Sequence, residues 1–468
     1  MAPSRREDGA VGSGPPLEQT SRFASYRDPD SRIRVEGDQV VREFSPKGAD
    51  SFRGANAHGV LRELAEEGLV VDYAIEESET LRVVSNRIPF VSYPAEWTSG
   101  MLKEAGLLTL EIARRLWAAG FHLRDASAYN VVFEGTTPRF VDLGSIGLGN
   151  TPLWSAYGQF CDHFLNPLLI EVKTGVPFQP LWTLEGIPVA TTRKILHGWK
   201  GFGSGAFRNV MLRARLESSL EDAGSGARRA ARTELGISPA QVDRMLMGMS
   251  DLLESLEVGG VSHWATYTAG NSYDEAGEAR RDDMIREFSA KGPGGVALDI
   301  GTNTGRHASV LAEHYETVVA LDSDATAIEA ARARFETDMI ADRVYPVVAD
   351  IANPTPGLGL LNQERIPLLD RLTGVAGVTW MAVVHHLVIG RSIPLEALAA
   401  LAARLSSRHL IEFVDLDDPM SQLLAASKGD EHHPYDQQNF EKAFGEYFNV
   451  THVGQTLDTR PVFELFSG

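Results

Sequence analysis

The sequence lacks the features of a secreted or membrane-embedded protein. It has a single cysteine, Cys161, among 468 residues, which excludes an internal disulfide and a metal site built from several cysteines. No leader segment or long apolar run is visible, so we expect a cytoplasmic protein with no membrane partner. Basic residues are also scarce: the formal net charge of −19 argues against general nucleic-acid binding, which needs a basic face.

The most informative stretch of the chain is Val296-Ala-Leu-Asp-Ile-Gly-Thr-Asn-Thr-Gly305. Its first half predicts a buried strand that leads into a glycine-containing turn and then into a helix over about 306–314. A second apolar strand ends on Asp322. Gly301 and Gly305 allow a ligand to approach the backbone, and Asp322 can accept hydrogen bonds from both hydroxyls of a ribose. The stretch therefore predicts a nucleoside site at the edge of a parallel sheet.

Two kinds of nucleoside ligand compete for this site. A dinucleotide requires the tighter G-x-G-x-x-G turn, which this chain does not have. Two glycines four apart, preceded by Asp299, instead favour a ligand with a cationic amino-acid tail, such as S-adenosylmethionine (SAM). The pattern resembles the first two motifs of class I SAM-dependent methyltransferases. This resemblance implies cofactor contacts from Asp299, Gly301, Thr302, Asn303, Gly305, Asp322 and Ser323.

The downstream segments follow the order expected of that class. A third strand over 344–350 ends on Asp350, where the resemblance implies a contact to the adenine amino group, with Ile351 packed on the adenine face. We predict a fourth strand over 375–384, a helix over 394–405, a fifth strand over 409–414, a helix over 438–447 and a closing hairpin of strands 450–455 and 461–466. The predicted fold class is α/β, with a Rossmann-like, seven-stranded class I methyltransferase sheet at the C-terminus.

A second set of motifs lies in the first half of the chain. Asp125, Asn130 five residues later, a short hairpin and then Asp142-x-Gly144 resemble the catalytic and metal-binding loops of protein-kinase-like folds. The resemblance implies that Asp125 orients an acceptor hydroxyl, while Asn130 and Asp142 hold magnesium against nucleotide phosphates. We therefore expect an α+β, kinase-like domain upstream of the methyltransferase domain.

The other kinase elements are weak, which favours a degenerate domain. Residues 32–45 carry no glycine cluster, and the basic candidates are Lys47 or Arg42. A helix over about 57–67 offers Glu63, Glu66 and Glu67, as any amphipathic surface helix does. In a degenerate domain, Asp125 and Asn130 would stabilise their loop, and the domain would position an acceptor substrate.

Length and composition divide the chain into four parts. We predict a disordered tail over 1–25, a kinase-like domain over 26–200, a helical linker over 201–262 with a hinge at Gly224–Gly226, and a methyltransferase domain over 263–468. Tyr267 and Tyr273, just before a helix over 275–288, are candidates to line the cofactor site; packing against that helix is the alternative.

The whole arrangement resembles a family of bacterial methyltransferases related to nodulation proteins, from about residue 26 to the C-terminus. Where members of that family tend to have Ile-Asp-Thr-Leu-Ser, this chain has Val-Asp-Leu-Gly-Ser, so the kinase-like Gly144 can be incidental. The markers of the resemblance are residues 87–97, 123–130, 157–163, 185–188, 267–273 and 412–419.

Two histidines are the candidate catalytic residues. His385 and His386 follow the fourth strand, at the ligand-binding edge of the sheet, and a neutral imidazole can accept a proton from the acceptor. His385 is favoured, because His386 is expected to point into helix packing. A metal site is a weaker alternative, and we predict none; its ligands would come from Glu412, Asp415, Asp417, Asp418, His432 and His433.

These observations leave three functional hypotheses. The leading one is a SAM-dependent methyltransferase that modifies an oxygen, nitrogen or carbon atom of a small molecule, with the N-terminal domain aiding recognition. The second is a bifunctional methyltransferase and ATP-dependent kinase. The third is a SAM-binding scaffold without activity. Self-association into a homo-oligomer stays open in all three.

Overall fold

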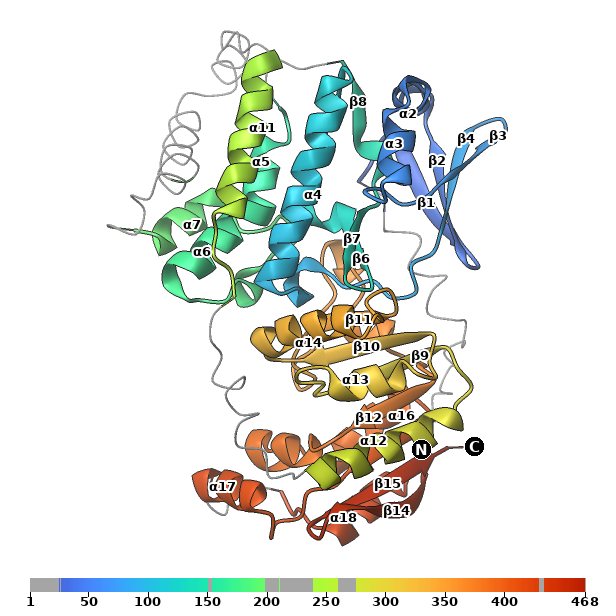
Figure 1. Ribbon diagram of the computed structural model, residues 1–468, viewed down its shortest axis with the longest axis vertical. Coiled ribbons are helices and arrows are strands. Elements are labelled where there is room, and N and C mark those ends of the chain that lie inside the picture. Colours follow the sequence, from blue (N-terminus) through green and yellow to red (C-terminus); the bar gives the residue numbers. More distant parts are fainter. Residues whose placement is uncertain are drawn as a thin grey trace, which may run out of the picture.

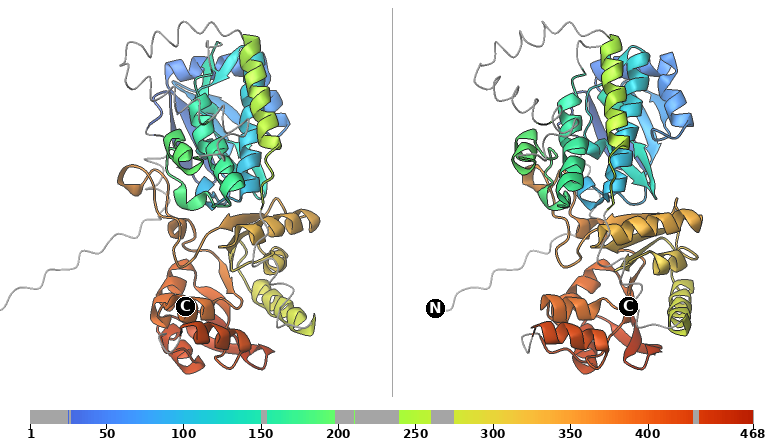
Figure 2. Two further views of the ribbon diagram at one scale, coloured as in Figure 1. Left: turned by 90° about the vertical axis from the view of Figure 1, so that its left-hand side faces the viewer. Right: turned by 60° about the vertical axis from the view of Figure 1, so that its left-hand side comes forward.

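The computed structural model describes residues 25, 27–149, 154–197, 210, 239–259, 275–428 and 433–467. The N-terminal domain is stacked on one end of the C-terminal domain (Figures 1 and 2). The predicted disordered tail, apart from Ser25, and the predicted hinge at Gly224–Gly226 lie outside the described residues.

A small antiparallel sheet opens the N-terminal domain, with the strand order β1-β2-β4-β3. Glu36 pairs with Gln39, so β1 and β2 are joined by the tight turn Gly37–Asp38. The helix predicted over 57–67 is two helices, which meet at Gly59; its φ of 98° ends the first helix. The elements of this part are β1 (Ser31–Glu36), β2 (Gln39–Phe44), α2 (Pro46–His58), α3 (Val60–Glu66), β3 (Ala74–Glu77) and β4 (Leu81–Asn86).

The rest of the N-terminal domain is largely helical. Its longest helix, α4 (Ser99–Ala118), begins at Thr98, whose side chain accepts a hydrogen bond from the backbone N–H of Met101. The remaining elements are η1 (Pro94–Glu96), β5 (Phe121–Leu123), η2 (Ala128–Asn130), β6 (Val131–Glu134), β7 (Thr137–Phe140), η3 (Leu143–Ser145), β8 (Ile146–Leu148), α5 (Tyr157–Phe160), η4 (Cys161–Leu165), α6 (Asn166–Thr174), η5 (Gln179–Leu181), α7 (Val189–Ile195) and α11 (Pro239–Glu254).

Helix α11 lies within the stretch predicted as a helical linker. It runs alongside α4 (Figures 1 and 2), and its buried residues Val242, Leu246, Met249 and Leu253 join the hydrophobic core of the N-terminal domain. The apolar spacing of these residues is that of a helix with one buried face. One face of this helix therefore packs into the N-terminal core.

A seven-stranded sheet forms the centre of the C-terminal domain. Its strand order is β11-β10-β9-β12-β13-β15-β14, and every neighbouring pair is parallel except the two pairs that involve β15. The predicted closing hairpin is therefore confirmed as an antiparallel end. The strands are β9 (Val296–Ile300), β10 (Thr317–Asp322), β11 (Val344–Val348), β12 (Gly377–Trp380), β13 (Arg408–Glu412), β14 (Asn449–Leu457) and β15 (Arg460–Phe466).

Helices cover both faces of this sheet. One apolar cluster joins the sheet to α12, α13 and α14, and the other joins it to α15, α16 and α18. The helices are α12 (Glu275–Ala290), α13 (Arg306–Leu311), α14 (Ala325–Thr337), η9 (Leu360–Asn362), α15 (Leu368–Arg371), η10 (His386–Gly390), α16 (Leu395–Leu405), α17 (Pro419–Lys428) and α18 (Gln437–Phe444). No helix in the described part of the chain is long and apolar enough to cross a membrane.

The two domains meet at the edge strand β11. Phe90 packs edge-on against Tyr345 of this strand, with ring centroids 6.1 Å apart. The backbone N–H of Thr136, in the β6–β7 turn, donates to the carbonyl of Ala341, just before the strand, at 2.8 Å. Phe90 belongs to the same apolar cluster as the C-terminal sheet. The interface is therefore a continuous packed layer.

Candidate active site

The predicted glycine turn connects β9 to α13 and folds back over the end of β10. The N–H groups of Gly301 and Thr302 both donate to the carbonyl of Leu321, at 2.9 and 3.1 Å. Gly301 has a φ of 73°, and a Cβ there would lie 2.7 Å from Val383 Cγ2. Gly305 has a φ of 82°, and a Cβ there would lie 2.5 Å from the ring of Phe335. Both glycines are therefore required by backbone conformation and by packing.

Asp322 ends β10 beside this turn. Its Oδ2 accepts the N–H of Asn303 at 2.9 Å, and its Oδ1 accepts the N–H of Asp324 at 2.9 Å. Burial raises the pKa of the Asp322 carboxyl. These two hydrogen bonds use one lone pair of each carboxylate oxygen. The second lone pair of each oxygen can accept a hydrogen bond from a ligand hydroxyl. The neighbouring Ser323 is exposed.

Buried polar groups without partners lie next to the turn. Asp299 is fully buried, and its Oδ1 accepts the hydroxyl of Thr379 on β12 at 2.7 Å. Within the described residues, Asp299 Oδ2 and Thr302 Oγ1 are buried and have no hydrogen-bond partner. Burial raises the pKa of Asp299 to about 6. A cationic ligand group near this edge would stabilise the charged carboxylate, so these residues fit the ammonium tail of SAM.

Asp350 follows β11 at the same edge of the sheet. Its Oδ1 accepts the N–H of Ala352 at 2.9 Å, and its Oδ2 pairs with Arg391 at 2.9 Å. Ile351 is buried, with 7% of its surface exposed. Because β9, β10 and β11 are parallel, the glycine turn, Asp322 and Asp350 meet at one edge, as predicted. No sequence pattern marked Arg391, which has to be displaced or shared if Asp350 contacts an adenine.

His385 and His386 lie after β12, and their rings are tilted by 39° to each other with centroids 4.1 Å apart. His385 is only 2% exposed and its Nδ1 has no partner among the described residues, whereas His386 is half-buried. Burial lowers the pKa of both imidazoles. The structure reverses the expected orientation, because His385 is the histidine that enters the packing. His386 is the better placed of the two to meet an acceptor.

Two of the four carboxylates considered as metal ligands, Glu412 and Asp418, are engaged by arginines. Glu412 is fully buried and forms a bidentate ion pair with Arg281 of α12. Asp418 forms a bidentate pair with Arg460, with N–O distances of 2.7 and 3.1 Å. His432 lies outside the described residues, as do Tyr267 and Tyr273. Among the residues that the structure describes, no cluster of three or more His, Cys, Asp or Glu side chains could hold a metal ion.

The kinase-like motif residues converge in the N-terminal domain. Asp125 Oδ1 accepts the N–H of Ser127 at 2.8 Å, and the Asn130 amide donates to the carbonyl of Asp125 at 3.3 Å. Burial and the nearby carboxylate of Asp142 raise the pKa of Asp125. Two carboxylates and an amide thus come from two adjacent loops.

A cation already occupies this convergence. Arg42, on β2, is buried and its Nη1 lies 2.8 Å from Asp142 Oδ1. Lys47, the other basic candidate, is exposed and pairs with Asp30. The helix glutamates lie on or next to α3, where Glu67 pairs with Arg115. Of the two basic candidates, Arg42 is the one that contacts a residue of the motif, Asp142.

No protein-family model matches the chain. It is 30% identical over 446 residues to the nodulation protein NoeA of Rhizobium meliloti (strain 1021), and the match covers 91% of each chain. Among solved structures, the bifunctional kinase-methyltransferase WbdD superposes with a TM-score of 0.30 at 16% identity, over 44% of this chain and 42% of that one. The N-methyltransferase NodS from Bradyrhizobium japonicum WM9 superposes with a TM-score of 0.30 at 13% identity, over 41% of this chain and 97% of that one.

Proposed function

This chain belongs to the family of the nodulation protein NoeA, and from that premise we propose that it is a SAM-dependent methyltransferase acting on a small molecule in the cytoplasm. One observation carries the proposal. The glycine turn after β9 and the carboxylate of Asp322 meet at the carboxyl edge of a sheet whose far end is antiparallel. A turn of this kind beside an acidic strand end suits a nucleoside whose ribose hydroxyls are donors.

We assign the cofactor contacts residue by residue. Asp322 would accept hydrogen bonds from the ribose, and Asn303 would be held in place by the same carboxylate. Asp299 and Thr302 carry the unpartnered oxygens that would meet the ammonium tail. Asp350 and Ile351 would bind the adenine, while Gly301, Gly305 and Ser323 would border the ligand. Bound SAM would supply an electrophilic methyl group.

The protein's own part in the reaction is to hold the acceptor and remove its proton. An acceptor hydroxyl or amine has to lie about 3 Å from the methyl carbon, in line with the bond that breaks. His386 is the proposed base, because its imidazole is neutral at pH 7 and half-buried at this edge. The low pKa of His385 and its burial suit a role in packing beneath His386.

For the N-terminal domain we propose a role in recognising the acceptor. A phosphotransferase needs Asp142 free to hold magnesium, yet this carboxylate is paired with Arg42. The tight β1–β2 turn, Gly37–Asp38, also offers a carboxylate where kinases place glycines over phosphates. These contacts support the degenerate domain over a bifunctional kinase.

Calorimetry with SAM, S-adenosylhomocysteine and Mg-ATP tests the proposal. Native protein should bind the first two ligands and not the third. Asp322→Asn should weaken SAM binding by roughly 1.5 to 3 kcal/mol, because it removes charge-assisted hydrogen bonds to the ribose. Asp342→Asn is the matched control, since Asp342 is exposed and lies away from the carboxyl edge. Equal SAM affinities for native protein and Asp322→Asn would refute the site.

The acceptor can then be sought by chemistry. Extracts of a deletion strain, incubated with the pure protein and labelled SAM, should yield a labelled product that the Asp322→Asn variant does not form. SAM binding without any labelled product, in extracts from several growth conditions, would favour the inactive scaffold.

A further inference from the structure

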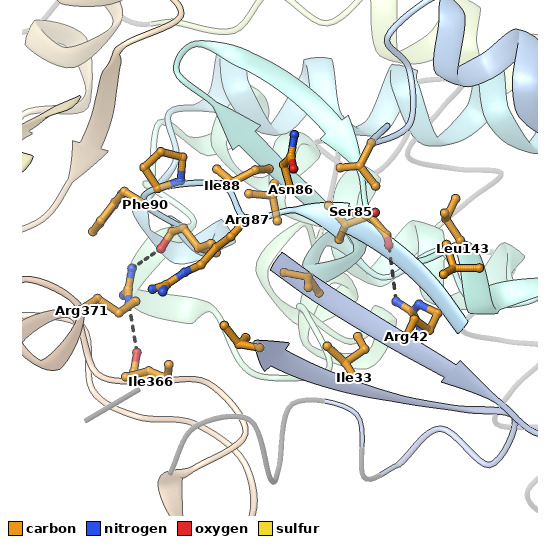
Figure 3. A pocket seen from close by; sticks show the side chains of 18 of the residues that line it. Ile33, Arg42, Ser85, Asn86, Arg87, Ile88, Phe90, Leu143, Ile366 and Arg371 are labelled. Atoms are coloured by element: carbon orange, nitrogen blue, oxygen red, sulfur yellow. Dashed lines mark hydrogen bonds between the residues drawn. The ribbon is translucent and has the colours of Figure 1, made fainter. Parts of the chain in front are cut away.

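A cavity of about 310 Å³ lies inside the N-terminal domain, next to the other domain. Strands β1, β2 and β4 contribute to its lining, as do Val132, Val141 and Leu143. Figure 3 shows this cavity from close by. The segment after β4, residues 86–91, closes one side. Ile366 and Arg371 of the C-terminal domain complete the lining. A volume of this size fits a small organic molecule.

The chemistry of the lining is mostly apolar. Apart from Arg42, Ser85, Asn86, Arg87, Tyr93 and Arg371, every lining residue is aliphatic, phenylalanine or proline. The lining includes no Asp or Glu, although the whole chain has a formal net charge of −19. The cavity thus combines an apolar interior with positive charge.

The three lining arginines differ in what they contact. Arg42 is paired with Asp142, and Arg371 is paired with Glu96 and donates to the carbonyl of Val91 at 2.6 Å. The guanidinium of Arg87 is half-buried and makes no hydrogen bond or ion pair within the described part of the chain. In the view of Figure 3, Arg87 lies on the same side of the cavity as Arg371, with Arg42 on the opposite side. Arg87 is therefore the lining cation whose charge is not balanced.

A metal-bound triphosphate does not match this distribution. Its phosphates would have to lie near Asp142, where the carboxylate is already occupied by Arg42, and beside the acidic turn after Glu36. The charge that lacks a partner among the described residues, that of Arg87, lies at the other end of the cavity. A single anionic group beside Arg87 would gain charge-assisted hydrogen bonds, and an apolar body could fill the remaining space.

We propose that this cavity binds an amphipathic anion, a small molecule with an apolar aromatic or aliphatic body and one carboxylate, sulfonate or phosphate group, whose anionic group contacts Arg87. The apolar walls supply affinity for the body of the ligand, and Arg87 selects ligands that carry a negative charge. This site is separate from the SAM site and does not depend on methyl transfer.

Two fluorescent probes of nearly equal shape test the proposal on the full chain. 8-Anilinonaphthalene-1-sulfonate carries one anionic group, and N-phenyl-1-naphthylamine is its neutral counterpart. The sulfonate should bind the native protein more tightly than the neutral probe. Arg87→Gln should raise the dissociation constant of the sulfonate roughly tenfold or more and leave that of the neutral probe nearly unchanged. Arg87→Lys should retain most of the affinity for the sulfonate.

Three further measurements locate the probe. Arg82→Gln is the matched control and should bind the sulfonate as native protein does, because Arg82 lies on β4, on the face opposite Val83, and is paired with Glu76. Val40→Phe should reduce the binding of both probes, because it fills the cavity. Equal sulfonate binding by native protein and Arg87→Gln would overturn the proposal. Displacement of the sulfonate by Mg-ATP at micromolar concentration would overturn it in favour of a nucleotide site.

Discussion

Replacing Arg371 by methionine would leave the carboxylate of Glu96 buried between the two domains with no cation beside it. The two side chains form a bidentate ion pair, in which Glu96 is fully buried and the side chain of Arg371 is 6% exposed. Arg371 also donates to the carbonyls of Val91 and Ile366, and its guanidinium lies 4.3 Å from the centre of the Tyr93 ring. One side chain thus links α15 to the segment that precedes α4.

The size of the effect follows from desolvation. Removing one member of a buried pair costs about 3 to 5 kcal/mol, because the remaining charge has lost both water and partner. Methionine keeps most of the apolar contact of the arginine stem, so the loss should come mainly from the charge. We expect the free energy of unfolding to fall by that amount. If the two domains show separate unfolding transitions, the urea midpoints of both transitions should fall, since the ion pair joins the two domains.

Urea unfolding followed by circular dichroism at constant pH measures this loss. Arg404→Met is the control, because Arg404 pairs with Asp370, the residue next to Arg371, but on the surface, where such a pair contributes less than about 1 kcal/mol. Adding Glu96→Gln to Arg371→Met should restore part of the stability, since the unpaired charge is gone. A loss below about 1 kcal/mol for Arg371→Met, or a double variant less stable than the single one, would refute this account.

Three other outcomes are expected. Gly305→Ala should cost about 1 to 3 kcal/mol in urea unfolding, because its Cβ would overlap a buried ring, whereas Gly175→Ala, with a similar φ of 72° and open space, should cost about 1 kcal/mol. Burial lowers the pKa of His409 to about 4, so the unfolded chain binds a proton that the folded one does not as pH falls below 6.5; this histidine should account for roughly 2 kcal/mol of the stability that native protein loses between pH 7 and pH 5, and His409→Gln should lose about that much less than native protein over the same range. His386→Gln should slow methyl transfer at least about 100-fold with little change in SAM affinity, whereas His385→Gln should chiefly lower stability; equal effects on transfer would contradict the assignment of His386 as the base.

The C-terminal sheet was the most predictable part of the molecule, because its signals are local. One strand–turn–helix–strand unit contains all of these signals. They are the apolar run over 296–300, the two glycines and the acidic end at Asp322, and each of them has one structural role. Element boundaries were less accurate: the predicted fourth strand over 375–384 is β12 over Gly377–Trp380, since the chain turns into the π-helical segment η10 soon after. Short apolar runs alone do not mark where pairing stops.

Features that depend on distant contacts could not be predicted. Arg42 and Asp142 are a hundred residues apart, and only the packing of β2 on the loop after β7 makes them partners. The order of burial of His385 and His386 depends on the helical turn that begins between them, which the sequence does not specify. Helix α11 lies in the stretch predicted as a helical linker, and the spacing of Val242, Leu246, Met249 and Leu253 reveals that one of its faces is buried.

The contact along β11 has a consequence for how the two halves can exist apart. An edge strand carries unpaired N–H and C=O groups that recruit other strands, and natural proteins shield such edges to remain monodisperse. Here the shield is the segment around Phe90 and the β6–β7 turn, both supplied by the other half of the polypeptide. A C-terminal fragment made alone would present this strand and the ring of Tyr345 to its neighbours and would self-associate through them. When the two halves are synthesised together, each should cover the surface that the other exposes, and both should remain soluble.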